Sequence, residues 1–309
     1  MADLRRVVTE KDDAATIMAK HVQPRLDLQA AVLRRHKITG ETLALTNEDI
    51  CGLSHFLLFG KPLFNELVVR SSEMVEAQYA QLAKELGMHI TASYFKRYGD
   101  LNYNLVSVFD KNGRIVGEYR KTHIPPSEMW HLADGDDLNI IDLGFVRLGV
   151  LICYDMMFPE AASVLALQNA EVILHPTGGY GWYDAIGEAT LKVRANDSSA
   201  YILTAKNAVN NGAGKSSIID PWGHVLADAG FYPDVLVSAT IDLDRKKEQP
   251  SWFYPSQMSG YADIRERYPL ERRPELYGAV AKPAKRLPTP NEAQREVLRK
   301  KVESGECRW

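Results

Sequence analysis

The sequence predicts a layered α/β domain in which helices cover two packed sheets. Apolar segments with strand character alternate with amphipathic helical segments along most of the chain. Lys111-Asn-Gly-Arg114 joins two strand-like segments, and Asn-Gly in that position is a strong hairpin signal. The chain has 309 residues, of which 45% are hydrophobic, so it can bury a large core.

Helices are predicted where apolar residues recur at spacings of three and four. Val75, Tyr79, Leu82 and Leu86 mark one such face, and Gly87 ends that helix. The helices expected along the chain cover 14–21, 26–36, 72–86, 161–170, 187–200 and 291–304. Strands are expected over 88–95, 105–110, 115–120, 145–153, 171–175, 201–208, 214–220 and 234–244. Residues 1–55 show no clear opening strand.

Cys153 is the first candidate for chemistry because it ends an apolar strand and precedes a turn into a helix. A strand end fixes the direction of the thiol, and a helix N-terminus nearby favours the thiolate. Pro159 and Glu160 suit the first turn of that helix. The alternative is a buried structural cysteine.

Two further segments carry charged residues beside apolar ones. Lys121 lies where the second hairpin strand ends, so it could supply a fixed positive charge, although a solvated lysine is the alternative. Glu66 lies among Phe64, Leu67 and Val68, where an unpaired carboxylate would be costly to bury. Such surroundings would raise its pKa and suit a general base, unless Glu66 lies on the polar side of an edge strand.

Glu66, Lys121 and Cys153, in this order, resemble the nitrilase superfamily of carbon–nitrogen hydrolases. The resemblance covers roughly residues 56–280 and includes Phe158-Pro-Glu160 after the cysteine. The family usually shows Pro-Glu where this chain has Asn65-Glu66. The resemblance implies a four-layer αββα sandwich. It places the hydrolase domain over 1–280, with a divergent part at 1–55, and a C-terminal extension over 281–309.

The resemblance also implies a role for each group. Glu66 would take the thiol proton as Cys153 attacks a carbonyl or nitrile carbon. Lys121 and the backbone N–H of Tyr154 would face the developing oxyanion. Ammonia or an amine would leave, and water activated by Glu66 would hydrolyse the thioester, so Glu66→Gln is expected to lose most turnover. Glu128 best matches a second glutamate that binds the lysine or orients the substrate.

The segment after the nucleophile resembles the amidase and carbamoyl-hydrolase branches more than true nitrilases, which tend to show Cys-Trp-Glu. Met157 stands where omega-amidase-like relatives have an Arg, which weakens the case for a bound substrate carboxylate. Arg194 could substitute for that Arg or simply be exposed. Aromatic residues after strand ends could line a half-apolar pocket for a small amide or N-carbamoyl amine, or could fill a dimer interface. They are Trp130, Tyr180, Trp182 and Tyr183.

Composition excludes several classes of function. A net charge of −3 without a basic cluster argues against nucleic acid. No stretch of about 18 apolar residues predicts a membrane span, and the N-terminus lacks the apolar part of a signal peptide. Cys51, Cys153 and Cys307 are too few for a disulfide framework, which favours the cytoplasm. No metal and no cofactor are expected, since the histidines are dispersed. The resemblance implies a homodimer or higher homo-oligomer.

Several functions remain open. The leading one is a cysteine amidohydrolase acting on a small linear amide or an N-carbamoyl compound. A true nitrilase would release ammonia from a nitrile but not from amides or ureido compounds, and a non-catalytic scaffold or binding protein would release none. A Cys–His transferase or protease would use His123 or His175 as its base instead of Glu66.

Overall fold

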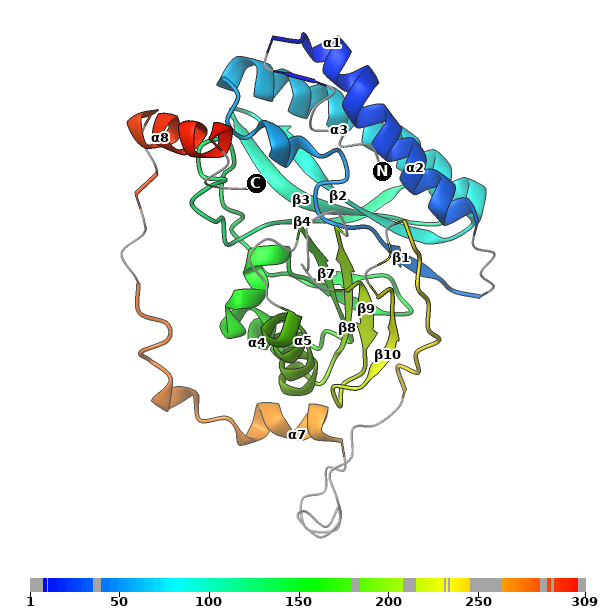
Figure 1. The fold of residues 1–309 in the computed structure, drawn as a ribbon. Helices are drawn as coiled ribbons and strands as arrows, with labels where there is room; N and C mark the ends of the chain where they lie inside the picture. Colours follow the sequence, from blue (N-terminus) through cyan, green and yellow to red (C-terminus); the bar gives the residue numbers. More distant parts are fainter. Residues whose placement is uncertain are drawn as a thin grey trace.

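A computed structural model of the chain has the four-layer αββα architecture that the sequence predicts (Figure 1). Two sheets form the inner layers, and helices cover the outer face of each (Figure 1). The fold class is therefore confirmed. The structure describes residues 8–9, 11–35, 40–178, 184–207, 215–230, 232, 234–244, 263–283, 288–289 and 292–304.

The first sheet has the strand order β1-β2-β3-β4. Its strands are β1 (Leu43–Leu45), β2 (His89–Tyr98), β3 (Leu101–Phe109) and β4 (Ile115–Arg120). β1 pairs with β2 in parallel, whereas β2, β3 and β4 are antiparallel, which confirms the predicted hairpin. The helical elements on this side are α1 (Ala14–Ile17), the π-helical turn η2 (Met18–Val22), α2 (Gln23–Arg34), the 3₁₀ turn η3 (Leu53–Phe56) and α3 (Lys61–Leu86).

The second sheet has the order β10-β9-β8-β7-β6-β5, and β6, β7 and β8 run parallel to one another. Its strands are β5 (Ile141–Asp142), β6 (Arg147–Val150), β7 (Val172–Thr177), β8 (Tyr201–Lys206), β9 (Ser217–Ile219) and β10 (Val225–Asp228). The other elements are η4 (Cys153–Met157), α4 (Pro159–Leu167), α5 (Asp184–Ser198), α7 (Ile264–Glu271), η5 (Pro274–Leu276) and α8 (Glu292–Glu303). α4 and α5 cover this sheet (Figure 1).

Three buried apolar clusters fill the spaces between the four layers. One joins α2 and α3 to the first sheet, as Leu26 and Tyr79 illustrate, and another joins α4 and α5 to the second sheet. The third lies between the sheets, where Val106 faces residues such as Leu174. Burial of apolar area at each interface therefore holds the layers together.

Several elements differ from the sequence prediction, including β5, β10 and α7, which were not expected. α3 begins at Lys61 rather than at residue 72, because the buried face of the helix continues back through Val68 and Phe64. β1 is an opening strand within residues 1–55, where none was expected. Residues 234–244 form no strand. Instead, β10 pairs antiparallel with β9, and a tight turn in which Gly223 has a φ of 86° connects the two strands.

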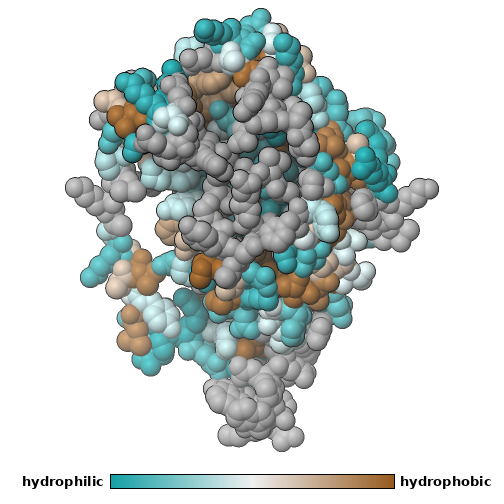
Figure 2. Space-filling view, viewed as in Figure 1, coloured by the Kyte–Doolittle hydropathy of each residue, from teal (hydrophilic) through white to brown (hydrophobic). Residues whose placement is uncertain are grey.

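The coloured part of the face in Figure 2 carries hydrophobic residues in separate patches among hydrophilic ones. In the part of the chain that the structure describes, none of the helices combines the length and the apolar character needed to span a membrane.

Candidate active site

Cys153 sits in a sharp turn directly after β6. Its φ is 44°, which an L-residue adopts only at a cost of about 1–3 kcal/mol. Two bonds to β7 hold the approach to this turn. The Leu151 amide donates to the Leu174 carbonyl at 2.9 Å, and the Leu151 carbonyl lies 2.9 Å from His175 Nδ1. The chain therefore turns at the thiol-bearing residue through a fixed, strained backbone, and the strand itself ends at Val150, three residues before its predicted end.

Lys121 lies between two carboxylates at the end of β4. Its Nζ is 2.9 Å from Glu48 Oε1, and 3.1 and 3.0 Å from the two oxygens of Glu128. The Lys121 side chain is 0% exposed, so the ion pairs are shielded from water. The predicted positions of Lys121 and Glu128 in one cluster agree with this geometry.

Glu48 follows β1 and is held by donors from three different elements. Besides Lys121, the Asn104 side-chain amide donates to its Oε1 at 2.9 Å, and the Gly178 backbone N–H donates to its Oε2 at 2.7 Å. A buried carboxylate with three donors is oriented as well as compensated. Glu48 is thus the carboxylate that the fold aims at the Lys121 ammonium.

Glu66 lies elsewhere, so its predicted place in this cluster is wrong. It is in the second turn of α3, its side chain is 49% exposed, and it pairs with Arg70 at 2.8 Å one helical turn later. The physical reason is periodicity: Phe64, Leu67 and Val68 form the buried face of a helix, and Glu66 falls outside that face.

A signal for Glu48 is present in the sequence. The dipeptide Asn-Glu occurs three times, as Asn47-Glu48, Asn65-Glu66 and Asn291-Glu292, and the first follows the apolar segment Leu43–Leu45. A carboxylate directly after a short strand lies at a sheet edge, where ligands commonly bind in α/β folds. Placing a strand at 43–45 would have pointed to Glu48.

The Cys153 thiol has a low acidity in this environment. Burial, together with the Glu48 carboxylate, raises the pKa of the Cys153 thiol to about 12, although Lys121 and a hydrogen bond from Thr177 act in the opposite direction. The helix whose N-terminus is expected to favour the thiolate is α4, which begins at Pro159 after the short 3₁₀ turn η4, and its effect on the thiol stays a prediction. The resting thiol is protonated and needs a base to become a nucleophile.

The two carboxylates around Lys121 differ in acidity. Burial alone would raise the pKa of Glu48, but the Lys121 ammonium and the bonds from Gly178 and Asn104 lower it below its usual value. Burial raises the pKa of Glu128 to about 7, because Lys121 does not fully offset it and the Glu48 charge adds to it. The pKa of Lys121 stays well above its usual value, since Glu128 and Glu48 outweigh the effect of burial. One ammonium thus keeps Glu48 ionised, while Glu128 titrates near neutrality.

A second buried carboxylate, Asp155, ties the Lys121 segment to the Cys153 turn. Its side chain is 0% exposed, and it accepts a bond from the Ile152 N–H at 2.9 Å. From the other segment it accepts bonds from the Tyr119 hydroxyl at 2.8 Å, the Thr122 hydroxyl at 3.1 Å, and His123 through its N–H at 2.8 Å and Nδ1 at 2.9 Å. The sequence analysis assigned no role to Asp155.

The remaining predicted residues have different locations. Tyr154 is in the first turn of η4, where backbone N–H groups have no acceptor within the helix. Trp130 is buried, 9% exposed, in the turn that follows Glu128. Arg194 lies on α5 and is 3.6 Å from Asp197 of the same helix. The other three predicted aromatic residues lie outside the described part of the chain: Tyr180, Trp182 and Tyr183.

His123 and His175 are both engaged by other groups, His123 by Asp155 and stacking on Phe158, and His175 by Leu151. Burial lowers the pKa of His175 to about 4, so it is neutral at physiological pH. Over the described ranges, no three His, Cys, Asp or Glu side chains are grouped as metal ligands.

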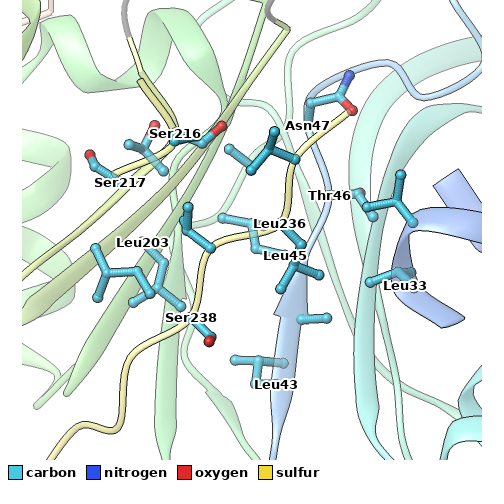
Figure 3. Close-up of a pocket in the computed structure, with 18 of the residues that line it drawn as sticks. Leu33, Leu43, Leu45, Thr46, Asn47, Leu203, Ser216, Ser217, Leu236 and Ser238 are labelled. Atoms are coloured by element: carbon cyan, nitrogen blue, oxygen red, sulfur yellow. The ribbon is translucent and has the colours of Figure 1, made fainter. Parts of the chain in front are cut away.

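A cavity of about 710 Å³ lies beside this cluster rather than in it. Leu43 and Leu45 of β1, Leu203 of β8 and Leu236 of the extended segment 234–244 line it (Figure 3). Asn47, the neighbour of Glu48, also lines it. The candidate active site is therefore the place where the charged groups and the thiol meet, and not this cavity.

Comparison with known proteins gives consistent similarities. The family described as carbon–nitrogen hydrolase matches residues 56–250, which include Lys121, Glu128 and Cys153 but not Glu48. The protein called "Hydrolase in pqqF 5′region" of Pseudomonas protegens is 32% identical over 268 residues, 83% of this chain and 88% of that protein. N-carbamoylputrescine amidase of Solanum lycopersicum is 32% identical over 63% of this chain and 69% of its own length.

An omega-amidase of Xenopus laevis is 31% identical, and the match covers 64% of this chain and 72% of that protein. Among solved structures, a carbon–nitrogen hydrolase from Helicobacter pylori G27 has a TM-score of 0.67 at 23% identity, covering 86% of this chain and 94% of that one. An amidase from Nesterenkonia sp. AN1, in a structure with acrylamide added to its active-site cysteine, has a TM-score of 0.63 at 19% identity. It covers 87% of this chain and 94% of that one.

Proposed function

Because the chain belongs to the carbon–nitrogen hydrolase family, we propose that it is a cysteine amidohydrolase that cleaves a small linear amide or an N-carbamoyl compound through a thioester. The observation that carries the proposal is the meeting of Lys121 with Glu48 and Glu128 next to the half-buried thiol of Cys153. The reaction needs a nucleophile, a base and a positive charge at one place, and these four side chains supply them.

Acylation begins with the protonated thiol. Glu48 takes the proton from Cys153 as the sulfur attacks the substrate carbonyl carbon, so the thiolate and the new bond form together. The positive charge of the Lys121 ammonium and a hydrogen bond from the Tyr154 N–H stabilise the oxyanion. The proton on Glu48 then passes to the leaving nitrogen, the C–N bond breaks, and ammonia or an amine departs from the thioester.

Deacylation uses the same base. Glu48 takes a proton from a water molecule as its oxygen attacks the thioester carbon, and the oxyanion again faces Lys121. The C–S bond breaks, the carboxylic acid product leaves, and the sulfur regains its proton. Glu128 holds Lys121 throughout, through both carboxylate oxygens.

The substrate class is supported by the named relatives, which include N-carbamoylputrescine amidases and omega-amidases. Met157, which stands where related amidases carry an Arg, is 50% exposed. The chain therefore offers no cation at this position for a substrate carboxylate, which favours an amide or ureido substrate without one there.

Assembly and location are part of the same proposal. Apolar side chains on α4 and α5 are exposed, namely Val164, Leu167 and Val193, which supports a homodimer formed through the helix next to the nucleophile. Cys51 and Cys153 are free thiols, as expected in the reducing cytoplasm. Light scattering at several protein concentrations would measure the assembly size.

A panel of linear amides, N-carbamoyl amines and nitriles, with ammonia detection, tests the function. The expected result is ammonia release from an amide or a ureido compound, and no release by Cys153→Ala at any substrate. Release from nitriles alone would make the chain a nitrilase. No release from the whole panel, or unchanged release by Cys153→Ala, would overturn the proposal.

A further inference from the structure

Thr177 at the carboxyl end of β7 lies beside the nucleophile as a consequence of strand register. β6 and β7 are parallel, and Val150 pairs with Leu174. Cys153 and Thr177 each lie three residues beyond this pair, so continuing the register brings them side by side. The Leu151 N–H donates to the Leu174 carbonyl at 2.9 Å within this last pair, and Ile152 stays extended, with φ −90° and ψ 117°, up to Cys153.

The contacts of this strand end reach both the nucleophile and the base. Thr177 is 4% exposed, and its side chain acts on the Cys153 thiol in the direction that lowers the pKa of the thiol. The next residue, Gly178, donates its N–H to Glu48 Oε2 at 2.7 Å. The Asn207 N–H donates to the Thr177 carbonyl at 3.2 Å and anchors the same backbone to β8.

The N–H groups of Lys121 are directed at carboxylate oxygens, so Lys121 is not the hydrogen-bond donor to the Cys153 sulfur. An ammonium has three N–H groups, and those of Lys121 lie within 3.1 Å of one oxygen of Glu48 and both oxygens of Glu128. A hydroxyl in a dry site, by contrast, can donate to a sulfur that gains negative charge, and such charge-assisted bonds are the stronger ones.

We propose that Thr177 is a further catalytic residue, whose hydroxyl donates a hydrogen bond to Cys153 Sγ and stabilises the sulfur as its proton leaves for Glu48. Only the expected effect of Thr177 on turnover rests on the proposed function. The proposed bond does not involve substrate, so its effect on the thiol can be measured independently of any amide.

The test compares Thr177→Val, which keeps the side-chain shape, with Thr177→Ser, which keeps the hydroxyl. Alkylation of Cys153 by iodoacetamide is followed by mass spectrometry from pH 6 to 11, and ammonia release is measured on the best substrate. Thr177→Val should move the alkylation profile upward by about one pH unit and slow alkylation about tenfold at a fixed pH. Its kcat should fall by a similar factor, while Thr177→Ser should stay within about threefold of wild type.

Thr204→Val is the matched control. Thr204 is also 4% exposed, on the next strand, and its hydroxyl donates to the His175 carbonyl at 3.1 Å rather than to the sulfur. It should leave the alkylation profile in place. Thr177→Ala supplies the same comparison if the valine variant unfolds.

An unchanged profile in a folded Thr177 variant without the hydroxyl would overturn the inference, as would the same shift in Thr204→Val. If no amide or ureido compound is hydrolysed but the profile shifts as expected, the proposed function fails and the role of Thr177 towards the thiol stands.

Discussion

Replacing Asp155 by Asn should destabilise the protein strongly, although the two side chains have nearly the same shape. Asp155 Oδ2 accepts from the Ile152 N–H and the Tyr119 hydroxyl, and Oδ1 accepts from His123 and Thr122. An Asn must place an NH₂ group where one of these oxygens stands. Whichever it replaces, a buried backbone N–H, of Ile152 or of His123, then faces another donor.

The magnitude follows from the bonds that change. A buried donor without an acceptor costs about 1–3 kcal/mol, and the bonds that remain lose the contribution of the carboxylate charge. The free energy of unfolding of Asp155→Asn should therefore fall by at least about 3 kcal/mol. Because the network joins the Lys121 segment to the Cys153 turn, a shift of about 1 Å would also lower kcat about 100-fold.

Urea denaturation measures the stability change, and ammonia release measures the effect on turnover. Tyr119→Phe removes a single donor and should cost about 1.5–3 kcal/mol. Asp100→Asn is the surface control, since its side chain is fully exposed, and should change the free energy of unfolding by less than about 0.5 kcal/mol. An Asp155→Asn protein within about 1 kcal/mol of wild type would refute the reasoning.

Three further predictions follow from the same geometry. Glu48→Gln removes a negative charge that, together with burial, raises the pKa of the Cys153 thiol. Alkylation of Cys153 by iodoacetamide at pH 8 should therefore become at least about tenfold faster. Equal or slower alkylation would contradict this. Glu128 has a folded-state pKa of about 7, above its ordinary value, so the folded state binds more protons and stability is lost as pH rises from about 4.5 to 7. Urea titrations should show this loss, of up to about 3 kcal/mol, in wild type but not in Glu128→Gln. In Gly135→Ala the new Cβ would lie 2.2 Å from the carbonyl oxygen of Arg120, the residue before Lys121. This clash should displace Lys121 and lower kcat more than about tenfold. Gly278→Ala is the control, because Gly278 has open space around it, and its kcat should match wild type.

Local signals in the sequence predict the parts of the fold and site that depend on neighbouring residues. The Asn112-Gly113 turn and its flanking segments predict the hairpin β3–β4 and thus the position of Lys121 at a strand end. The apolar segment before Cys153 likewise predicts a thiol at the end of β6. In each case the controlling interactions lie within a few residues along the chain.

Long-range pairing explains what the sequence analysis missed. β1 has three residues, and its place in the sheet depends on parallel pairing with β2, more than forty positions later. Without that strand, the sequence pattern gives no location for Glu48, and it favours Glu66 because this carboxylate lies in an apolar segment. Asp155 and Thr177 likewise gain their roles from partners on other strands.

The central claim is that Glu48, and not Glu66, is the base that serves Cys153. Ammonia release by Glu48→Gln and Glu66→Gln, measured side by side on one substrate, tests it most directly because the chemical change is identical. We expect turnover to fall about 100-fold or more in Glu48→Gln and to stay within about twofold of wild type in Glu66→Gln. A folded Glu48→Gln protein that retains turnover, or a Glu66→Gln protein that loses it, would contradict the account.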